Sequence, residues 1–260
     1  MAEAPFVTFL IAGVQKGGTT ALYDYLADYP DLALSRVKEV HFFDDETRDW
    51  ERPDYGAYHA RFAAPGARPC GEATPIYLYW PNALARVRAY NPAMRLIVAL
   101  RDPVERAWSH WRMEYARGAE RAPFAWCIRQ GRQRLFDGEP PATPWGHHRE
   151  FSYVERGFYG EQLAQLFALF PHEQVLVIRA EDLRADPAAS LAAVRRFLDL
   201  AEAPPPPPRE AHVGREMDYG AGLAAEDVDW LRRVYARDQA RLQALIGWSY
   251  AGFSGTPASA

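Results

Sequence analysis

Residues 6–20 read FVTFLIAGVQKGGTT, an apolar run that breaks into a loop of lysine, glycine and threonine. The apolar run is strand-like, and a helical pattern begins directly after the loop, at Ala21. Strand, glycine turn and helix N-terminus together form a cradle for an oxyanion, because exposed N–H groups and the helix dipole both favour negative charge. Lys16 adds a cation, and Thr19 and Thr20 add hydroxyl donors. The stretch therefore predicts an oxyanion site at the end of a strand.

The order of residues in this loop separates it from the Walker A loop of ATP-binding proteins. Walker A reads G-x-x-x-x-G-K-[ST], with the lysine directly before the serine or threonine at the helix start. Here Lys16 precedes Gly17 and Gly18, near the beginning of the turn. A P-loop phosphotransferase or nucleotidase that uses Mg-ATP therefore stays as the alternative function, and an ordinary strand-to-helix turn stays as the structural alternative.

Two further motifs accompany the loop. Residues 38–44 read KEVHFFD, and residues 96–109 read LIVALRDPVERAWS, a strand ending in Arg101 and a helix that carries Ser109. With QKGGTT at 15–20, they resemble the sulfotransferases that use 3'-phosphoadenosine 5'-phosphosulfate (PAPS). The most similar branch includes the heparan sulfate N- and 3-O-sulfotransferase domains and many bacterial relatives. The resemblance runs over nearly the whole chain.

The resemblance implies transfer of a sulfuryl group from PAPS to a hydroxyl or amine of a glycan, lipid or small-molecule acceptor. Such transfer is in-line, so catalysis is mostly positioning and electrostatics. In the family, the lysine matching Lys16 stands beside the bridging oxygen of the donor, and the residues matching Arg101 and Ser109 bind its 3'-phosphate. The residues expected to hold the donor are Lys16, Gly17, Gly18, Thr19, Thr20, Arg101, Ser109 and Arg215.

The KEVHFFD motif supplies the candidate general base. Glu39 matches the catalytic glutamate of the family, and its apolar neighbours Val40, Phe42 and Phe43 are expected to desolvate it and raise its basicity. His41 lies on the same side as Glu39 if the segment is extended, where it would touch the sulfonate or orient Glu39. A solvated Lys38-Glu39 pair and a core histidine are the structural alternatives. Asp44 and the two acidic residues after it are compatible with a solvated acidic turn.

Other positions match the family less closely. Residues 212–215 (HVGR) resemble a shortened cofactor loop in which Arg215 would reach a phosphate, and Arg156 opens a segment that resembles one near the cofactor. A structural role is the alternative for both arginines. Some glycosaminoglycan enzymes of the family carry a lysine where this chain has Ala73, which counts against heparan sulfate as the acceptor.

Composition excludes several classes of protein. A net charge of −4 gives no support for a basic nucleic-acid surface, and 48% apolar with 25% charged residues is ordinary for a globular domain. The two cysteines fit no metal spacing and indicate a reducing cytoplasm, so we expect no metal. The sequence has neither a signal peptide pattern nor an apolar run long enough for a membrane span. Oligomeric state stays open.

Alternating elements predict an α/β fold: a single domain at 1–260 with a central parallel sheet flanked by helices and a P-loop-like phosphosulfate-binding loop. The donor-binding core is expected at about 5–200, and a C-terminal helix with its tail at 209–260. A loop of unassigned function is expected at 137–148, and a polyproline II spacer at 204–208. Strands are expected at 6–12, around 71–72, at 95–100 and at 174–179; helices at 20–28, 81–90, 104–117, 159–169, 187–198 and 225–247.

Overall fold

Parallel strands form the centre of the part of the chain that carries the predicted loop. The structure is a computed structural model that describes residues 6–63, 66, 68–136, 146–207, 219 and 222–253. Within these residues the strands make one sheet of five, in the order β2-β3-β1-β4-β5, and every neighbouring pair is parallel. The strands are β1 (Phe9–Gly13), β2 (Ala33–Leu34), β3 (Cys70–Ala73), β4 (Arg95–Leu100) and β5 (Val175–Arg179).

The chain divides into two compact units. Unit 1 comprises Met1–Arg101 and Gln165–Ala211, and it contains the whole described sheet. Unit 2 comprises Asp102–Ala164 and His212–Ala260. The α/β fold with a parallel sheet flanked by helices is confirmed, whereas the single domain over 1–260 and its internal boundaries stay predictions.

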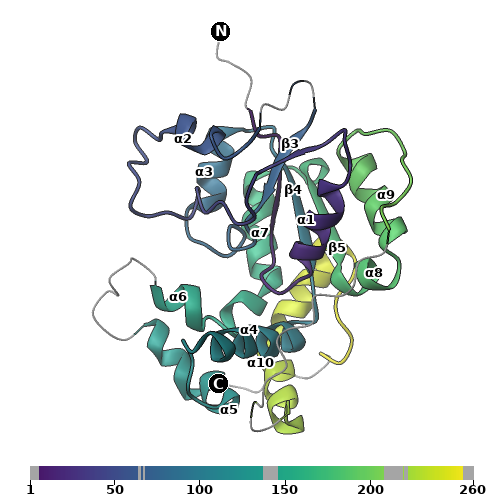
Figure 1. Ribbon diagram of the computed structural model, residues 1–260. Helices are drawn as coiled ribbons and strands as arrows, with labels where there is room; N and C mark the ends of the chain where they lie inside the picture. Colours follow the sequence, from purple (N-terminus) through teal and green to yellow (C-terminus); the bar gives the residue numbers. More distant parts are fainter. Residues whose placement is uncertain are drawn as a thin grey trace. The chain divides into compact units, whose positions relative to one another are not determined.

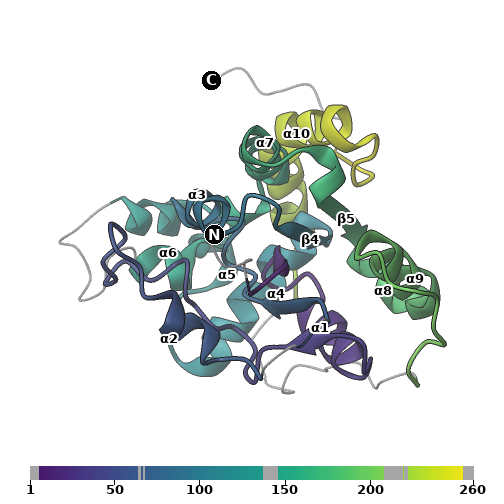
Figure 2. The same ribbon diagram turned by 90° about the horizontal axis from the view of Figure 1, so that it is seen from above.

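Helices cover both faces of the sheet in unit 1. Figure 1 shows α1, α8 and α9 on one side of the strands and α3 on the other, while α8 and α9 lie side by side near β5 (Figure 1, Figure 2). Burial of both faces explains why β1 and β4 are continuously apolar rather than alternating. The helices of this unit are α1 (Thr19–Ala27), α2 (Tyr55–His59), α3 (Ala83–Tyr90), α8 (Ala180–Ala185) and α9 (Pro187–Phe197).

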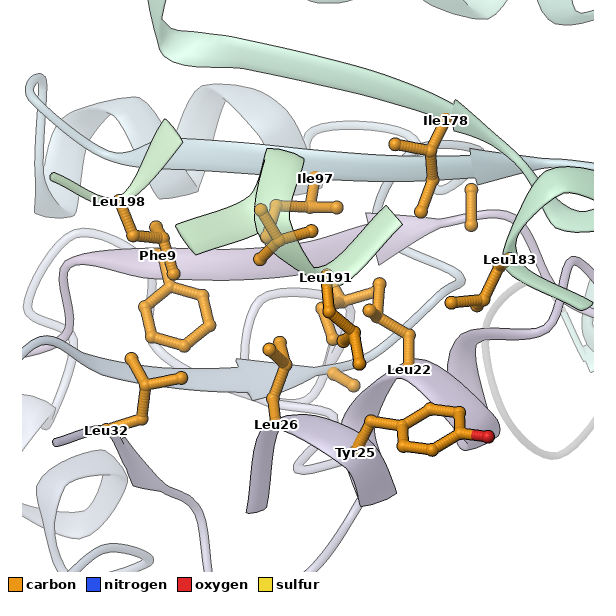
Figure 3. Packing of buried hydrophobic residues seen from close by; sticks show 14 of the residues in the cluster. Phe9, Leu22, Tyr25, Leu26, Leu32, Ile97, Ile178, Leu183, Leu191 and Leu198 are labelled. Carbon is orange, nitrogen blue, oxygen red and sulfur yellow. The ribbon is translucent and has the colours of Figure 1, made fainter. Parts of the chain in front are cut away.

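The main core of unit 1 lies between the sheet and α1, α8 and α9. Figure 3 shows Phe9 and Ile97 of adjacent strands packed towards Leu22 of α1 and Leu191 of α9. All four side chains are fully buried. Burying a side chain of this size contributes roughly 1.5–3 kcal/mol, so this layer fixes α1, and with it the preceding loop, against the strands.

Unit 2 is helical in its described part. Its elements are α4 (Pro103–Arg117), α5 (Phe124–Cys127), α6 (Gly146–Phe151) and α10 (Ala225–Ile246), with 3₁₀ turns at Gln130–Leu135 and Glu155–Gly157; α7 (Tyr159–Leu169) runs from this unit into unit 1. Asp102 caps α4 by accepting hydrogen bonds from the amides of Val104 and Glu105, at 2.8 and 3.1 Å. Tyr235 of α10 is fully buried and donates to the carbonyl of Val154 at 2.9 Å.

The long elements begin and end close to the predicted residues, whereas the short ones were missed. The strand at Arg95–Leu100 and the helix at Tyr159–Leu169 match their predicted bounds. The two-residue strand β2 and helices α2, α5 and α8 carry too few residues for a periodic pattern. Residues 204–207 have no regular secondary structure, and Pro208 lies outside the described residues.

The predicted loop at 137–148 is wrong at its end. Helix α6 begins at Gly146, so both histidines of that stretch are helical, while residues 137–145 lie outside the described part. The guanidinium of Arg156 donates to the carbonyls of His148 and Arg149, each at 3.0 Å, near the end of α6. This contact comes from outside the helix, so no local pattern in α6 reveals it.

Candidate active site

The ends of β1 and β4 bring two predicted donor residues to one edge of the sheet. The strands are adjacent and parallel, and Gly13 is paired with Val98. Lys16 and Arg101 each follow their paired residue by three positions. Ligands of open parallel sheets bind outside the carboxyl ends of the strands, so both side chains lie at the edge where a ligand is expected.

The loop between β1 and α1 is packed directly on the end of β4. The amide of Val14 donates to the carbonyl of Ala99 at 3.1 Å, and the amide of Gly17 donates to the carbonyl of Val14 at 2.9 Å. A Cβ atom on Gly17 would lie 2.2 Å from the Ala99 oxygen, so this position requires glycine. The Gly17 amide therefore closes the turn in this structure, and its predicted contact with the donor stays a prediction.

The first turn of α1 is open to an anion. Gly18 precedes the helix with φ 83°, which suits glycine, and no side chain caps this end. The first amide with a helical acceptor is that of Leu22, which donates to Gly18 at 3.1 Å. The amides of Thr19, Thr20 and the next residue belong to the turn whose N–H groups have no intrahelical acceptor, which is the ordinary anion site of a helix.

The segment that carries Glu39 is attached to the carboxyl end of β3. The amide of Glu39 donates to the carbonyl of Ala73 at 2.8 Å. Glu39 and His41 have φ values of 61° and 54°, so the segment is not extended. Their side chains nevertheless meet, with 3.5 Å between His41 Nε2 and Glu39 Oε2. The proximity expected from the sequence is present, but a left-handed backbone produces it instead of strand alternation.

Cations surround the Glu39 carboxylate. Lys38 Nζ lies 2.5 Å from Glu39 Oε1, and the glutamate side chain is 42% exposed. The hydrogen bond from His41 lowers the pKa of Glu39 most; burial opposes it, Lys38 adds to the lowering, and the pKa falls to about 2. The expected rise in basicity is therefore wrong, because the hydrogen bond from His41 and the charge of Lys38 outweigh the desolvation. The rings of Phe42 and Phe43 are buried in an aromatic cluster with Tyr58.

His41 lies between two carboxylates. Its Nδ1 is 2.9 Å from Oδ2 of Asp44, on the opposite side of the ring from Glu39. Burial alone would lower the pKa of His41, but the hydrogen bonds to Asp44 and Glu39 outweigh it and raise the pKa to about 9. The imidazole is therefore a cation at neutral pH, held in one orientation.

Asp44 is not part of a solvated turn. Its side chain is fully buried, whereas the adjacent Asp45 side chain is 29% exposed. Glu46 forms an ion pair with Arg86 at 2.6 Å and accepts a hydrogen bond from Trp80 at 2.9 Å. Two of the three carboxylates of the acidic run are therefore held by partners: Asp44 by the nearby His41, and Glu46 by Trp80 and Arg86, more than 30 residues away in the chain.

The remaining predicted residues, Ser109, Arg156 and Arg215, belong to unit 2. Ser109 lies in α4 of unit 2, so its meeting with Arg101 stays a prediction. Arg215 lies outside the described residues. Arg156 is buried and donates from Nε to the Ser152 hydroxyl at 2.7 Å, a contact within the protein that fits a structural role. The predicted position of Arg156 near the cofactor stays a prediction.

One candidate escaped the sequence reasoning. Arg179 ends β5 and is paired with Leu100, the residue before Arg101. The signal was present, because VLVIR at 175–179 repeats, in shortened form, the apolar run followed by arginine of LIVALR at 96–101. Arg179 therefore joins Lys16, Glu39 and Arg101 at the carboxyl edge.

The described residues contain no group of three or more histidine, cysteine or acidic side chains that could hold a metal ion. The expected absence of a metal stays a prediction. Over the same residues, no helix combines the length and apolarity that crossing a membrane requires.

Known proteins share both the sequence and the fold. The chain is 35% identical over 199 residues to human heparan sulfate glucosamine 3-O-sulfotransferase 6, an alignment of 75% of this chain and 53% of that protein. It is 27% identical over 212 residues to the bovine bifunctional heparan sulfate N-deacetylase/N-sulfotransferase 2, covering 74% of this chain and 22% of that protein. The chain thus spans about half or less of these relatives.

A solved structure matches almost end to end. The crystal structure of a sulfotransferase from Alicyclobacillus acidocaldarius superposes with a TM-score of 0.78 at 27% identity, covering 98% of this chain and 100% of that one. The family model of the sulfotransferase domain matches residues 7–206, which include the loop, the Glu39 segment and Arg101. Placement of the chain in a bacterial branch of the family stays a prediction. The family itself is shown: this chain belongs to the sulfotransferase domain family.

Proposed function

We propose that this protein transfers a sulfuryl group from PAPS to a hydroxyl or amine of an acceptor. The observation that carries the proposal is the carboxyl edge of the sheet. There an uncapped helix start, Lys16 and Arg101 follow adjacent strands, and Glu39 is hydrogen-bonded to the end of the next strand. Cations and amides suit an anionic donor, and a carboxylate suits removal of a proton.

The residues at this edge fit the donor by their chemistry. The open first turn of α1 offers amides to the 5'-phosphosulfate, with the hydroxyls of Thr19 and Thr20 beside them. Arg101 offers a planar pair of donors, which suits the 3'-phosphate. Ser109, Arg179 and Arg215 are further candidates for the phosphates.

PAPS, when bound, supplies the activated sulfuryl group. Glu39 takes the proton that the acceptor loses as the acceptor oxygen or nitrogen bonds to sulfur. Lys16 stabilises the negative charge left on the 5'-phosphate oxygen when the bond between sulfur and that oxygen breaks. Because the pKa of Glu39 is about 2, its carboxylate is ionised at neutral pH and able to accept a proton, although a general base works best when its pKa lies nearer the working pH.

For the acceptor, we propose a glycan that contains an amino sugar, ahead of a lipid or another small molecule. The support is the similarity to proteins named for heparan sulfate glucosamine sulfation. Ala73, at the end of β3, is buried and provides no cation for an acidic glycan at that position. The proposal therefore extends to less acidic glycans than heparan sulfate.

A reducing compartment, such as the cytoplasm, is also proposed. Cys70 and Cys127 are both buried free thiols, and burial raises the pKa of each to about 12. Thiols that stay unpaired, instead of forming disulfides, are typical of proteins in a reducing compartment.

The test follows both substrates. Purified protein is titrated calorimetrically with 3'-phosphoadenosine 5'-phosphate and, separately, with Mg-ATP, and release of the bisphosphate from PAPS is then measured with a panel of glycans, lipids and phenols. We expect binding of the bisphosphate and acceptor-dependent turnover. Preferential binding of Mg-ATP would contradict the proposal and return the P-loop alternative.

A further inference from the structure

The hydroxyl of Tyr77 joins the Glu39 segment to the interior of unit 1. Tyr77 is fully buried, and its oxygen accepts hydrogen bonds from the amides of Phe42 at 3.0 Å and Phe43 at 3.4 Å. The same hydroxyl donates to Oε1 of Glu72 at 2.9 Å. A phenol has one proton to give, so donation to Glu72 directs the oxygen lone pairs towards the two amides.

Glu72 is an unusual partner because it is a fully buried carboxylate held by hydroxyl groups. It lies in β3 with no exposed surface, and it also accepts from Thr74 at 2.5 Å and from Tyr58 at 3.0 Å. Burial raises the pKa of Glu72, and the three hydroxyl donors counteract that effect. No lysine or arginine of the described residues forms an ion pair with it. A carboxyl group that accepts from three hydroxyls at fixed positions gives the Tyr77 proton one direction in which to point.

The two amides lie between His41 and Asp44 in the chain, within the segment that carries the candidate base Glu39. The segment begins with the bond from Glu39 to the Ala73 carbonyl and passes through two left-handed residues. Such a backbone persists only where its surroundings hold it. The Tyr77 hydroxyl holds the two amides in the second half of the segment, while Arg86 donates to the Phe43 carbonyl at 2.9 Å.

We infer that Tyr77, oriented by Glu72, is a positioning residue that sets the geometry of Glu39, His41 and Asp44. The inference rests on the proposed function, since it assigns a role within the same site. The Tyr77 hydroxyl bonds to the amides of residues 42 and 43, so it acts through that backbone. A displacement of the base by a fraction of an ångström then appears in turnover rather than in donor binding.

The chain offers a matched control for this test. Tyr58 is also fully buried and also donates to Oε1 of Glu72, but it accepts no hydrogen bond from Phe42 or Phe43. Tyr77→Phe and Tyr58→Phe each remove one hydroxyl from Glu72 and keep the aromatic ring. Only Tyr77→Phe also releases the two amides.

We expect Tyr77→Phe to lower kcat about 10-fold with the KM for PAPS unchanged within about 2-fold, and Tyr58→Phe to change kcat less than about 2-fold. The titration of His41, followed by NMR of its ring protons, gives a readout that needs no activity. In Tyr77→Phe its pKa should move down from about 9, because the ring loses its fixed place between Asp44 and Glu39, and in Tyr58→Phe it should stay.

Equal kcat and equal His41 titration in the two variants would overturn the inference. If the wild-type protein fails to release the bisphosphate from PAPS, the proposed function fails, while the NMR comparison still decides the role of Tyr77. Should Tyr77→Phe not fold, amide exchange in the wild type takes its place. The Phe42 amide should then exchange as slowly as the β3 amides, and exchange at the rate of an open loop would reject the inference.

Discussion

The loop at residues 13–20 and the segment at residues 38–44 reach the same edge of the sheet by different physical means. The loop is held by backbone groups: Val14 and Gly17 bond to carbonyls, and the space beside Gly17 excludes any side chain. The segment is held by side chains: the Tyr77 hydroxyl on its amides and the Asp44 carboxylate on His41. Substitutions that add atoms should therefore disrupt the loop, and substitutions that remove polar atoms should disrupt the segment.

The largest effect is expected in the segment. Glu39→Gln keeps the shape of the side chain but cannot accept the proton, so turnover should fall by about 10²–10⁴ while binding of the bisphosphate persists. Glu51→Gln, an exposed carboxylate in the same unit, is the control and should leave turnover unchanged. Near wild-type turnover in Glu39→Gln would place the base elsewhere, and loss of bisphosphate binding would make Glu39 structural.

The chain has two lysines, Lys16 in the loop and Lys38 in the segment, so substituting each one compares the two regions directly. Lys16→Ala should lower turnover by about 10²–10³, since its charge is needed as the leaving oxygen becomes negative. Lys38 pairs with a carboxylate that is 42% exposed, so Lys38→Ala should change turnover less than about 5-fold. Steady-state rates with saturating PAPS measure the turnover of both variants. Similar losses of turnover in the two variants would show that the two lysines do not differ in their contribution to the reaction.

Gly17→Ala tests the backbone side of the comparison. The new Cβ would lie 2.2 Å from the Ala99 oxygen and 2.9 Å from the Val14 oxygen, so the variant should lose about 1–3 kcal/mol of unfolding free energy. Gly222→Ala is the control, because a Cβ there meets no described atom within 4 Å. Urea denaturation measures both variants. A Gly17→Ala protein as stable as wild type would mean that the loop moves away from β4 at little cost.

The smallest effect concerns pH and His41. The pKa of His41 is raised from 6.5 to about 9 in the folded protein. The contribution of the charged imidazole to the free energy of unfolding is therefore complete below pH 6.5 and is lost as the pH rises through 9. Since the side chain is 43% exposed, the stability difference between wild type and His41→Gln should shrink by less than about 1 kcal/mol between pH 6 and pH 9.5. Urea midpoints at these two pH values measure it. A difference that grows with pH would contradict the assigned charge.

The two regions also differ in how far the sequence predicted them. The loop could be predicted because glycine, lysine and threonine between a strand and a helix are typical of a turn with an anion site, a pattern that lies within a few neighbouring residues. The left-handed conformation of Glu39 and His41 could not be predicted, since only a few per cent of non-glycine residues adopt it, and even histidine, which is enriched there, usually does not. Arg179 was readable in principle, by the same pattern that revealed Arg101.

The sequence by itself determined the longer strands, the long helices and the oxyanion loop, because these depend on periodicity and on neighbours in the chain. Glu39 as the candidate base came from the resemblance to the family and stays a prediction. Only the tertiary structure decided that Glu39 has a pKa of about 2, that Asp44 is buried, and that Tyr77 bonds to the Phe42 amide from 35 residues away. These properties depend on which distant groups share a buried site, and the electrostatics of a buried site is set by those groups rather than by sequence neighbours.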